Sequence, residues 1–357
     1  MTHLQHLRLL ATALLAMLLF FQAAPAQQTP PAIQWQKSLG GRGYDYVHSI
    51  VLTNDSGYII AGWSRSTDGD VTGHHGLTDY WIVKLTSSGK IEWQKALGGS
   101  EHDYATSIAP TSDGGYIVAG ESESTDGDVS GNRGQDDYWI VKLTSMGDIE
   151  WQKLLGGDGD DYATSIAPTS DGGYIVAGGS NSGHGDVTGN HGQDDCWIVK
   201  LTSGGAIEWQ KSLGGSGYDY ANSIAPTSDG GYIVAGGSNS SNGDVTGNHG
   251  KTDYWIVKLT SMGDIAWQKS LGGSRSDKAT SIAPTSGGGY IVTGSSYSSD
   301  GDVTGHHGSS DSADVWVVKL TNMGGIEWQK SLGGSGAEAA NSIAPTSDGG
   351  YIRVVLE

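Results

Sequence analysis

A short polar loop recurs along the chain and carries oxygen-bearing side chains at a spacing that suits a cation. Its first copy runs from Asp68 to Gly73 as Asp-Gly-Asp-Val-Thr-Gly and reaches Asp79 at the twelfth position. Oxygen ligands at positions 1, 3, 5 and 12, with Gly at 6 for the sharp turn, are typical of calcium-binding loops. The sequence therefore predicts calcium ligands in three copies: Asp68, Asp70, Thr72 and Asp79; Asp126, Asp128, Ser130 and Asp137; and Asp300, Asp302, Thr304 and Asp311.

The same loops have a second interpretation as hydrogen-bonded turns. Two further copies begin with His184 and Asn242 instead of Asp, and the twelfth position is Asp rather than a bidentate Glu. Side chains of Asp and Thr commonly bond nearby backbone amides in turns rich in Gly. Calcium binding and a plain turn network both stay open at this point.

Other candidate groups repeat from unit to unit. Histidines gather in the same loops, but each loop offers only one or two of the three or four ligands that zinc needs: His74, His75, His191, His249, His306 and His307. Carboxylates open the first strand of each unit and could surround one mouth of a central channel: Asp45, Asp103, Asp161, Asp219, Asp277 and Glu338. A repeated ring favours a structural role, because acid–base catalysis needs inequivalent groups.

Trp63 is an unrepeated aromatic residue beside the long loop. The matching positions hold Glu121, Gly179, Gly237 and Ser295. A tryptophan at the end of a strand could stack on a sugar or on a partner protein, so we predict Trp63 as a ligand-binding residue. A surface tryptophan without a function is the alternative.

The elements that position these residues come from a strict repeat. The tryptophans of the WQK motif are spaced by 58, 58, 58, 58 and 61 residues: Trp35, Trp93, Trp151, Trp209, Trp267 and Trp328. A fixed period of this size indicates a repeat architecture. The second unit offers four strand-like segments, at about 103–110, 116–120, 137–144 and 149–155, with large apolar residues on both faces. Four short strands per unit predict an all-β β-propeller of four-stranded blades over residues 33–357.

The count of segments predicts about six blades. Residues 33–39 form an isolated copy of the last strand of a unit, five complete sets follow, and 337–345 and 351–355 form a final pair. The isolated segment could join that pair and close the ring. The sixth blade would still lack its third strand and its long loop, so we predict that the last blade is incomplete.

The N-terminus has the pattern of an export signal. Basic and histidine residues precede an apolar run, and Ala24-Pro25-Ala26 forms a small-residue cleavage site. We predict a signal peptide over 1–26, a lead-in over 27–32, and a secreted protein that is extracellular, on the cell surface or periplasmic, with no membrane span after cleavage. The net charge of -19 argues against nucleic acid and anionic membrane partners. The single cysteine, Cys196, excludes a disulfide and is predicted to replace a packed tyrosine.

The repeat text itself resembles a known family. The motifs DGDVTGNHG, DYWIVKL, WQK-x-LGG and DGGYIVAG resemble secreted bacterial repeat proteins of the Bacteroidetes type. That resemblance implies a β-propeller exported from the cell, with no assigned activity. Residues Leu85–Gly99 are more weakly similar to the repeats of quinoprotein-type propellers, which supports the fold but not a quinone cofactor.

These observations favour a secreted, non-enzymatic β-propeller that serves as a binding, adhesion or scaffold module for a glycan or protein partner. One alternative is an extracellular hydrolase or lyase acting on polysaccharide at the channel mouth, and another is a truncated repeat protein without independent function. An enzyme should break the repeat at a few clustered polar positions. The observed breaks are scattered in type and look like drift: Trp63, His184, Cys196, Lys278 and Ala339.

Overall fold

The computed structural model describes residues 32–309, 311–346 and 348–356. The chain divides into two units, Met1–Lys37 and Ser38–Glu357. The predicted signal peptide over 1–26 lies outside the described residues. No helix long and apolar enough to cross a membrane occurs in the part of the chain that the structure describes.

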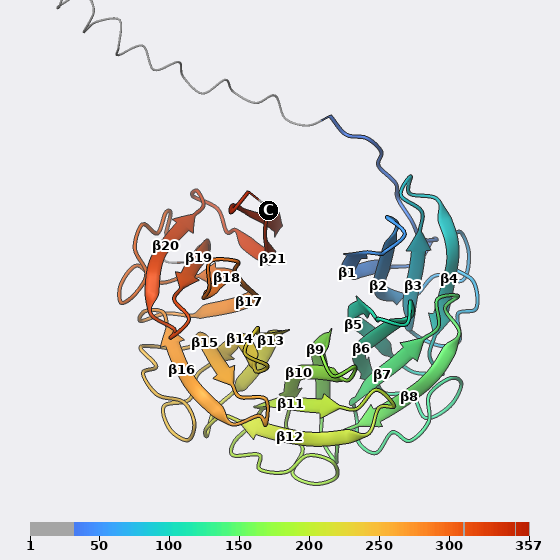
Figure 1. Cartoon of the computed structure of the whole chain (residues 1–357), viewed down its shortest axis with the longest axis horizontal. Coiled ribbons are helices and arrows are strands. Elements are labelled where there is room, and N and C mark those ends of the chain that lie inside the picture. The colour runs from blue at the N-terminus through green and yellow to red at the C-terminus, as the bar shows by residue number, and fades with distance from the viewer. Residues whose placement is uncertain (1–31, 310, 347, 357) are drawn as a thin grey trace, which may run out of the picture. The chain divides into compact units, whose positions relative to one another are not determined.

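The unit Ser38–Glu357 is an all-β β-propeller (Figure 1). Its described residues form five four-stranded antiparallel sheets, blades 1 to 5, and one two-stranded sheet, blade 6. Blade 1 contains β1 (Asp45–Leu52), β2 (Tyr58–Ser64), β3 (Asp79–Leu85) and β4 (Ile91–Leu97). Blade 2 contains β5 (Asp103–Pro110), β6 (Tyr116–Ser122), β7 (Asp137–Leu143) and β8 (Ile149–Leu155).

The remaining blades repeat this plan. Blade 3 contains β9 (Asp161–Pro168), β10 (Tyr174–Ser180), β11 (Asp195–Leu201) and β12 (Ile207–Leu213). Blade 4 contains β13 (Asp219–Pro226), β14 (Tyr232–Ser238), β15 (Asp253–Leu259) and β16 (Ile265–Leu271). Blade 5 contains β17 (Asp277–Pro284), β18 (Tyr290–Ser296), β19 (Asp314–Leu320) and β20 (Ile326–Leu332), and blade 6 contains β21 (Ala339–Pro345) and β22 (Tyr351–Leu356).

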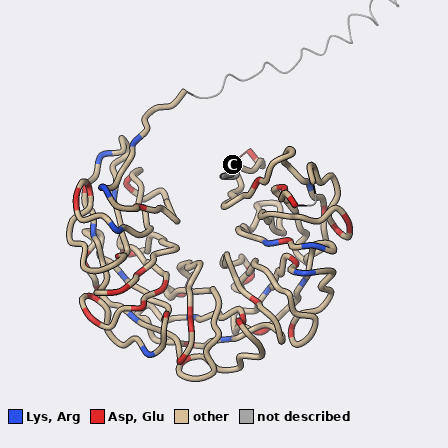
Figure 2. The backbone as a smooth tube through the Cα atoms, turned by 180° about the vertical axis from the view of Figure 1, so that it is seen from behind, with Lys and Arg blue, Asp and Glu red and all other residues tan. Residues whose placement is uncertain are grey.

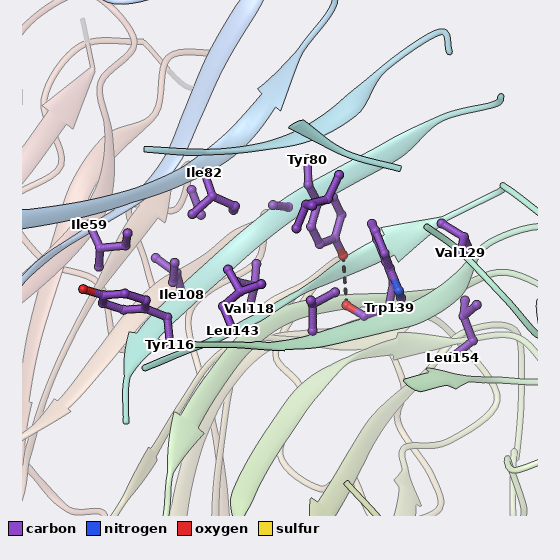
Figure 3. Close-up of a cluster of buried hydrophobic side chains, with 14 residues drawn as sticks. Ile59, Tyr80, Ile82, Ile108, Tyr116, Val118, Val129, Trp139, Leu143 and Leu154 are labelled. Atoms are coloured by element: carbon purple, nitrogen blue, oxygen red, sulfur yellow. Dashed lines mark hydrogen bonds between the residues drawn. The ribbon is translucent and has the colours of Figure 1, made fainter. Parts of the chain in front are cut away.

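Successive blades are joined by apolar packing and by buried hydrogen bonds. Tyr80 of blade 1 packs on Trp139 of blade 2 with ring centroids 4.5 Å apart, and its hydroxyl donates to the Trp139 carbonyl at 2.9 Å (Figure 3). Both side chains are fully buried. At the equivalent place in blade 3, Cys196 is also fully buried, which confirms that it stands in for a packed tyrosine.

A bulge in the first strands of blades 2 to 5 adds a second link between blades. The pairing of β5 with β6 shifts between Ala105 and Ser107, so Thr106 is left out of the ladder. The Thr106 hydroxyl then donates to the carbonyl of Ala163 in blade 3 at 2.7 Å. A bulge turns a side chain out of the regular alternation, and here that side chain is used to hold the neighbouring blade.

The predicted closing strand over 33–39 does not form. Residues 33–39 contain no strand, and β21 and β22 remain a two-stranded sheet. In the complete blades the fourth strand pairs with the third, as β8 does with β7. Blade 6 offers no third strand among its described residues, so a fourth strand would find no backbone ladder to join.

Candidate functional site

Many of the differences between the repeated units lie at one end of the blades. There, the second residue of each first strand pairs across the sheet with the sixth residue of the second strand. In blades 1 to 5 these pairs are Tyr46 with Trp63, Tyr104 with Glu121, Tyr162 with Gly179, Tyr220 with Gly237, and Lys278 with Ser295. We call these pairs, with the flanking loop residues Arg65, His102, Glu123, Asp136, Asp160, Lys251, Arg275 and Tyr297, the variable rim.

Two of the breaks in the repeat that look like drift in the sequence fall in equivalent cross-strand pairs of their blades. Trp63 and Lys278 lie at the same register of the variable rim, although in sequence they are far apart and on different strands. Cys196 lies instead in the buried core, and His184 lies in a loop, where its ring contacts Asp158. Aligning the units column by column and then applying the strand pairing would have found this grouping.

Blade 1 contributes an aromatic sector to the variable rim. The Trp63 ring stacks on Tyr46 with centroids 5.4 Å apart and planes 8° apart, and Tyr104 approaches edge-on at 5.6 Å. The Arg65 guanidinium carbon lies 5.7 Å from the centre of the Trp63 ring. The Trp63 indole donates to His48 Nε2 at 3.2 Å, and burial lowers the pKa of His48, which favours the neutral ring that can accept this bond. These contacts hold Trp63 in place while Tyr46 stays 56% exposed.

Blades 2 and 3 contribute an acidic sector. Burial, followed by the charges of Asp136 and Glu123, raises the pKa of Glu121 to about 7. Burial, followed by the charges of Glu123 and Asp160, raises the pKa of Asp136 to about 6. Like charges held together in a partly desolvated place disfavour ionisation. This sector is thus electrostatically unsatisfied near neutral pH and favours a cationic group.

Blades 4 and 5 contribute a cationic sector. A hollow of about 590 Å³ is lined by Lys251, Arg275, Ser276, Lys278, Ser295, Tyr297 and Asp311. The only carboxylate in this lining, Asp311, lies 3.9 Å from the Arg275 guanidinium. Acidic and basic residues occur in all five complete blades (Figure 2), but this hollow gathers three cations in a chain that has 39 acidic and 20 basic residues.

The predicted calcium ligands are placed close to backbone amides. Asp126 accepts the Ser100 amide at 2.7 Å and Asp128 accepts the Gly98 amide at 3.3 Å, so the long loop is tied to the turn that precedes its own blade. The other copies repeat this pattern: Asp68 with Arg42, Asp70 with Gly40, Asp300 with Ser274 and Asp302 with Gly272. At position 5 of each copy, the side-chain hydroxyl oxygen accepts a hydrogen bond from the side-chain amide of a glutamine: Thr72 from Gln94, Ser130 from Gln152 and Thr304 from Gln329.

The twelfth positions differ between copies. Asp79 and Asp137 are fully buried at the start of a third strand and accept the amides of His75 and Arg133. Asp311 is not their equivalent, because three extra residues in this loop move the start of β19 to Asp314. Within the described ranges, no group of three or more His, Cys, Asp or Glu side chains is close enough to share a metal ion. Calcium binding at these loops stays a prediction.

Four of the carboxylates that open the first strands are fully buried and so do not line a channel mouth: Asp103, Asp161, Asp219 and Asp277. Asp161 is fully buried at the junction of blades 2 and 3, where its Oδ2 accepts the Gly157 amide at 2.8 Å and the Ser182 hydroxyl at 2.7 Å. It faces Asp137 across Gly156, where an added methyl group would lie 2.3 Å from Asp137 Oδ1 and 2.5 Å from Asp161 Oδ2. Burial raises the pKa of Asp137 to about 6. These carboxylates brace the junction, in agreement with the predicted structural role.

The opposite ends of the strands carry hollows that are nearly the same from blade to blade. One is lined by Asp55, Lys84, Glu92, Trp93 and Tyr116, and similar hollows surround Lys200 and Lys258. The Lys84 ammonium donates to Asp55 at 2.8 Å, Glu92 at 2.9 Å and the Leu85 carbonyl at 3.2 Å. All three protons of the Lys84 ammonium thus form hydrogen bonds within the blade. We therefore interpret this repeated cluster as part of the structural framework and not as a binding site.

Comparison with known proteins finds similar proteins but indicates no activity for this chain. No family model matches the chain. A stretch of 181 residues, 48% of this chain, is 29% identical to the regulatory protein FlaEY of Caulobacter vibrioides, and the match spans only 19% of that protein's length. Among solved structures, a protein of unknown function from Bacteroides caccae is 13% identical with a TM-score of 0.44, covering 80% of this chain and 81% of that one. The WD40 domain of Neurospora crassa Pan2 is 13% identical with a TM-score of 0.47, covering 83% of this chain and 68% of that one.

Proposed function

We propose that this chain is a non-enzymatic binding module that engages a polypeptide partner at the variable rim. The observation that carries the proposal is the grouping of the differences between units at one register. Residues that are the same in every unit serve packing that every unit shares. Residues that differ between units at the variable rim are not required for the packing that all units share. We therefore infer that these residues are adapted to a binding partner.

The mixed chemistry of the variable rim favours a polypeptide over a uniformly charged polymer. Its sectors are aromatic at Trp63, acidic at Glu121 and cationic at Lys278. A nucleic acid presents phosphates throughout and would be repelled by the acidic sector. A polypeptide can offer aromatic, basic and acidic side chains in one segment, and aromatic residues with Arg are typical anchors of protein interfaces.

Export from the cytoplasm and calcium binding by the Asp-Gly-Asp loops are two further parts of this proposal. The predicted signal peptide would bring the module outside the cytoplasm. Calcium, if bound by the Asp-Gly-Asp loops, would stiffen the loops that follow each second strand. Neither is needed for the rim to bind a partner.

The test is a selection from a library of random twelve-residue peptides displayed on phage, using the full chain as bait. The matched control is a rim variant that carries Trp63→Gly, Glu121→Gly and Lys278→Tyr, since Gly and Tyr stand at these positions in other blades. We expect peptides that bind the wild-type chain and not the variant. Peptides that bind both equally would overturn the proposal, and rim-dependent binding on a glycan array without any peptide would replace the polypeptide by a glycan.

A further inference from the structure

The cationic hollow between blades 4 and 5 brings three basic side chains together in a strongly acidic chain. It is lined by Lys251, Arg275 and Lys278, with the hydroxyl-bearing residues Ser276, Ser295 and Tyr297 between them. Lys251 and Lys278 are exposed, whereas Arg275 and the three hydroxyl-bearing residues are partly buried. The hollow is therefore lined by two exposed lysines and by a partly buried arginine and hydroxyl-bearing residues.

The lysines of this hollow differ from the framework lysines of the same chain. The third strands each carry one buried lysine, and all five form an ion pair with a carboxylate: Lys84, Lys142, Lys200, Lys258 and Lys319. Among the described residues, no ion pair joins Lys251 or Lys278 to a carboxylate, although the chain has almost twice as many acidic as basic residues. Their charges thus serve no ion pair within the fold.

The other blades show that these cations are not needed for folding. Lys278 stands where blades 1 to 4 have Tyr46, Tyr104, Tyr162 and Tyr220, and Lys251 stands where blades 2 and 3 have Gln135 and Gln193. Blade 5 keeps the same strand pairing as those blades in spite of the exchange. The basic residues of the cationic sector are therefore specific to blades 4 and 5 and are not part of the packing that the blades share.

We propose that this hollow binds oxyanions, and that in the partner they are side-chain carboxylates of an acidic segment. This inference rests on the proposed function, because it names the chemistry that the rim recognises in this sector. Guanidinium and ammonium groups form strong, charge-assisted hydrogen bonds with carboxylate and phosphate oxygens, and the serine and tyrosine hydroxyls can donate to the remaining lone pairs. With the acidic sector on blades 2 and 3, the rim selects a segment that is basic at one end and acidic at the other.

The experiment titrates the full chain with three probes, a hexaglutamate peptide, inorganic phosphate and sulfate, at low and at high NaCl. The test variant carries Lys251→Gln and Lys278→Tyr, which restores residues that other blades have. The control variant carries Lys153→Gln and Lys269→Gln, which removes the same charge from exposed residues of the outer strands β8 and β16. Thermal unfolding of each variant checks that it is folded.

We expect hexaglutamate to bind the wild-type chain and the control variant alike, and to bind the test variant roughly tenfold more weakly. Added salt should reduce the affinity, because exposed charges are screened. Binding of phosphate or sulfate without hexaglutamate would overturn the carboxylate source and make the site one for free inorganic anions. Equal binding by wild type and test variant, or no binding of any probe, would overturn the site itself.

This result is separable from the fate of the proposed function. If the peptide selection succeeds through Trp63 or Glu121 while hexaglutamate does not bind, the rim is a binding surface and the oxyanion site is wrong. If hexaglutamate binds as expected but no selected peptide depends on the rest of the rim, the site stands as an anion site and the wider proposal fails.

Discussion

The acidic sector of the rim should make the protein less stable as pH rises through neutrality. Glu121 on β6 is partly buried, and its pKa is raised from 4.5 to about 7. Between these values the folded chain binds more protons than the unfolded chain, so the free energy of unfolding falls as pH increases. At about 1.4 kcal/mol per unit of pKa shift, the rise corresponds to a penalty of about 3 kcal/mol once the carboxylate is ionised.

Replacing Glu121 with Gln removes the charge and keeps the shape of the side chain. At pH 8 we expect E121Q to unfold with a free energy up to about 3 kcal/mol greater than that of the wild-type chain. The difference should shrink as pH falls and be close to zero at about pH 4, below the usual pKa of 4.5, because the Glu121 carboxyl is then mostly protonated in both the folded and the unfolded chain. The stability of E121Q should still depend on pH between pH 3.8 and about 6, because the pKa of Asp136 is raised from 3.8 to about 6.

Urea denaturation between pH 4 and 8, followed by tryptophan fluorescence, measures this difference. The control is Glu101→Gln, which neutralises an exposed carboxylate of the turn before blade 2 and should leave the pH profile unchanged. A variant that is less stable than wild type at pH 8, or whose advantage is the same at every pH, would refute the electrostatic reasoning. The first outcome would mean that the Glu121 carboxylate is satisfied by a partner in the fold.

Three further predictions concern the framework. Cys196→Tyr should raise the free energy of unfolding by about 1 kcal/mol, because the new hydroxyl can reach the Trp255 carbonyl as its counterparts do in blades 1, 2 and 4; a lower urea midpoint would show that the site cannot hold the larger ring. Thr106→Val should cost about 1 kcal/mol, because it removes the bond to the Ala163 carbonyl, and an unchanged midpoint would contradict this. Excess calcium should raise the midpoint of thermal unfolding, and a chelator should reverse the shift, because a ligand at about 100 times its dissociation constant stabilises the folded chain by roughly 2.7 kcal/mol per site. The same melt with and without chelator would identify the loops as plain turns.

The period of the repeat was enough to predict the fold because each unit contains all the signals of one blade. The strand-like segments of the second unit, the all-β class and the incomplete last blade are confirmed. The closing segment over 33–39 was predicted wrongly, because its likeness to β4 says nothing about whether a third strand is there to pair with it. Asp311 was misplaced for a related reason: counting positions along a loop fails when three residues are inserted before the strand.

The candidate site was less predictable, since it depends on pairing between strands that the sequence does not show directly. Trp63 was found because it occurs once, but its stacking on Tyr46 follows from the register of β1 against β2. Glu121 and Lys278 look like unrelated exchanges in sequence, and only the shared register shows that they occupy one rim. The buried aspartates of the first strands were predicted at the wrong place, because strand position alone does not give burial.

The most direct test of the variable rim as the binding surface is the affinity of a selected peptide for the wild-type chain and for the rim variant with Trp63→Gly, Glu121→Gly and Lys278→Tyr. We expect the variant to melt cooperatively and to bind the peptide at least about tenfold more weakly, a loss of about 1.4 kcal/mol. Equal affinity in a folded variant would contradict this expectation, and would move the binding surface away from the variable rim.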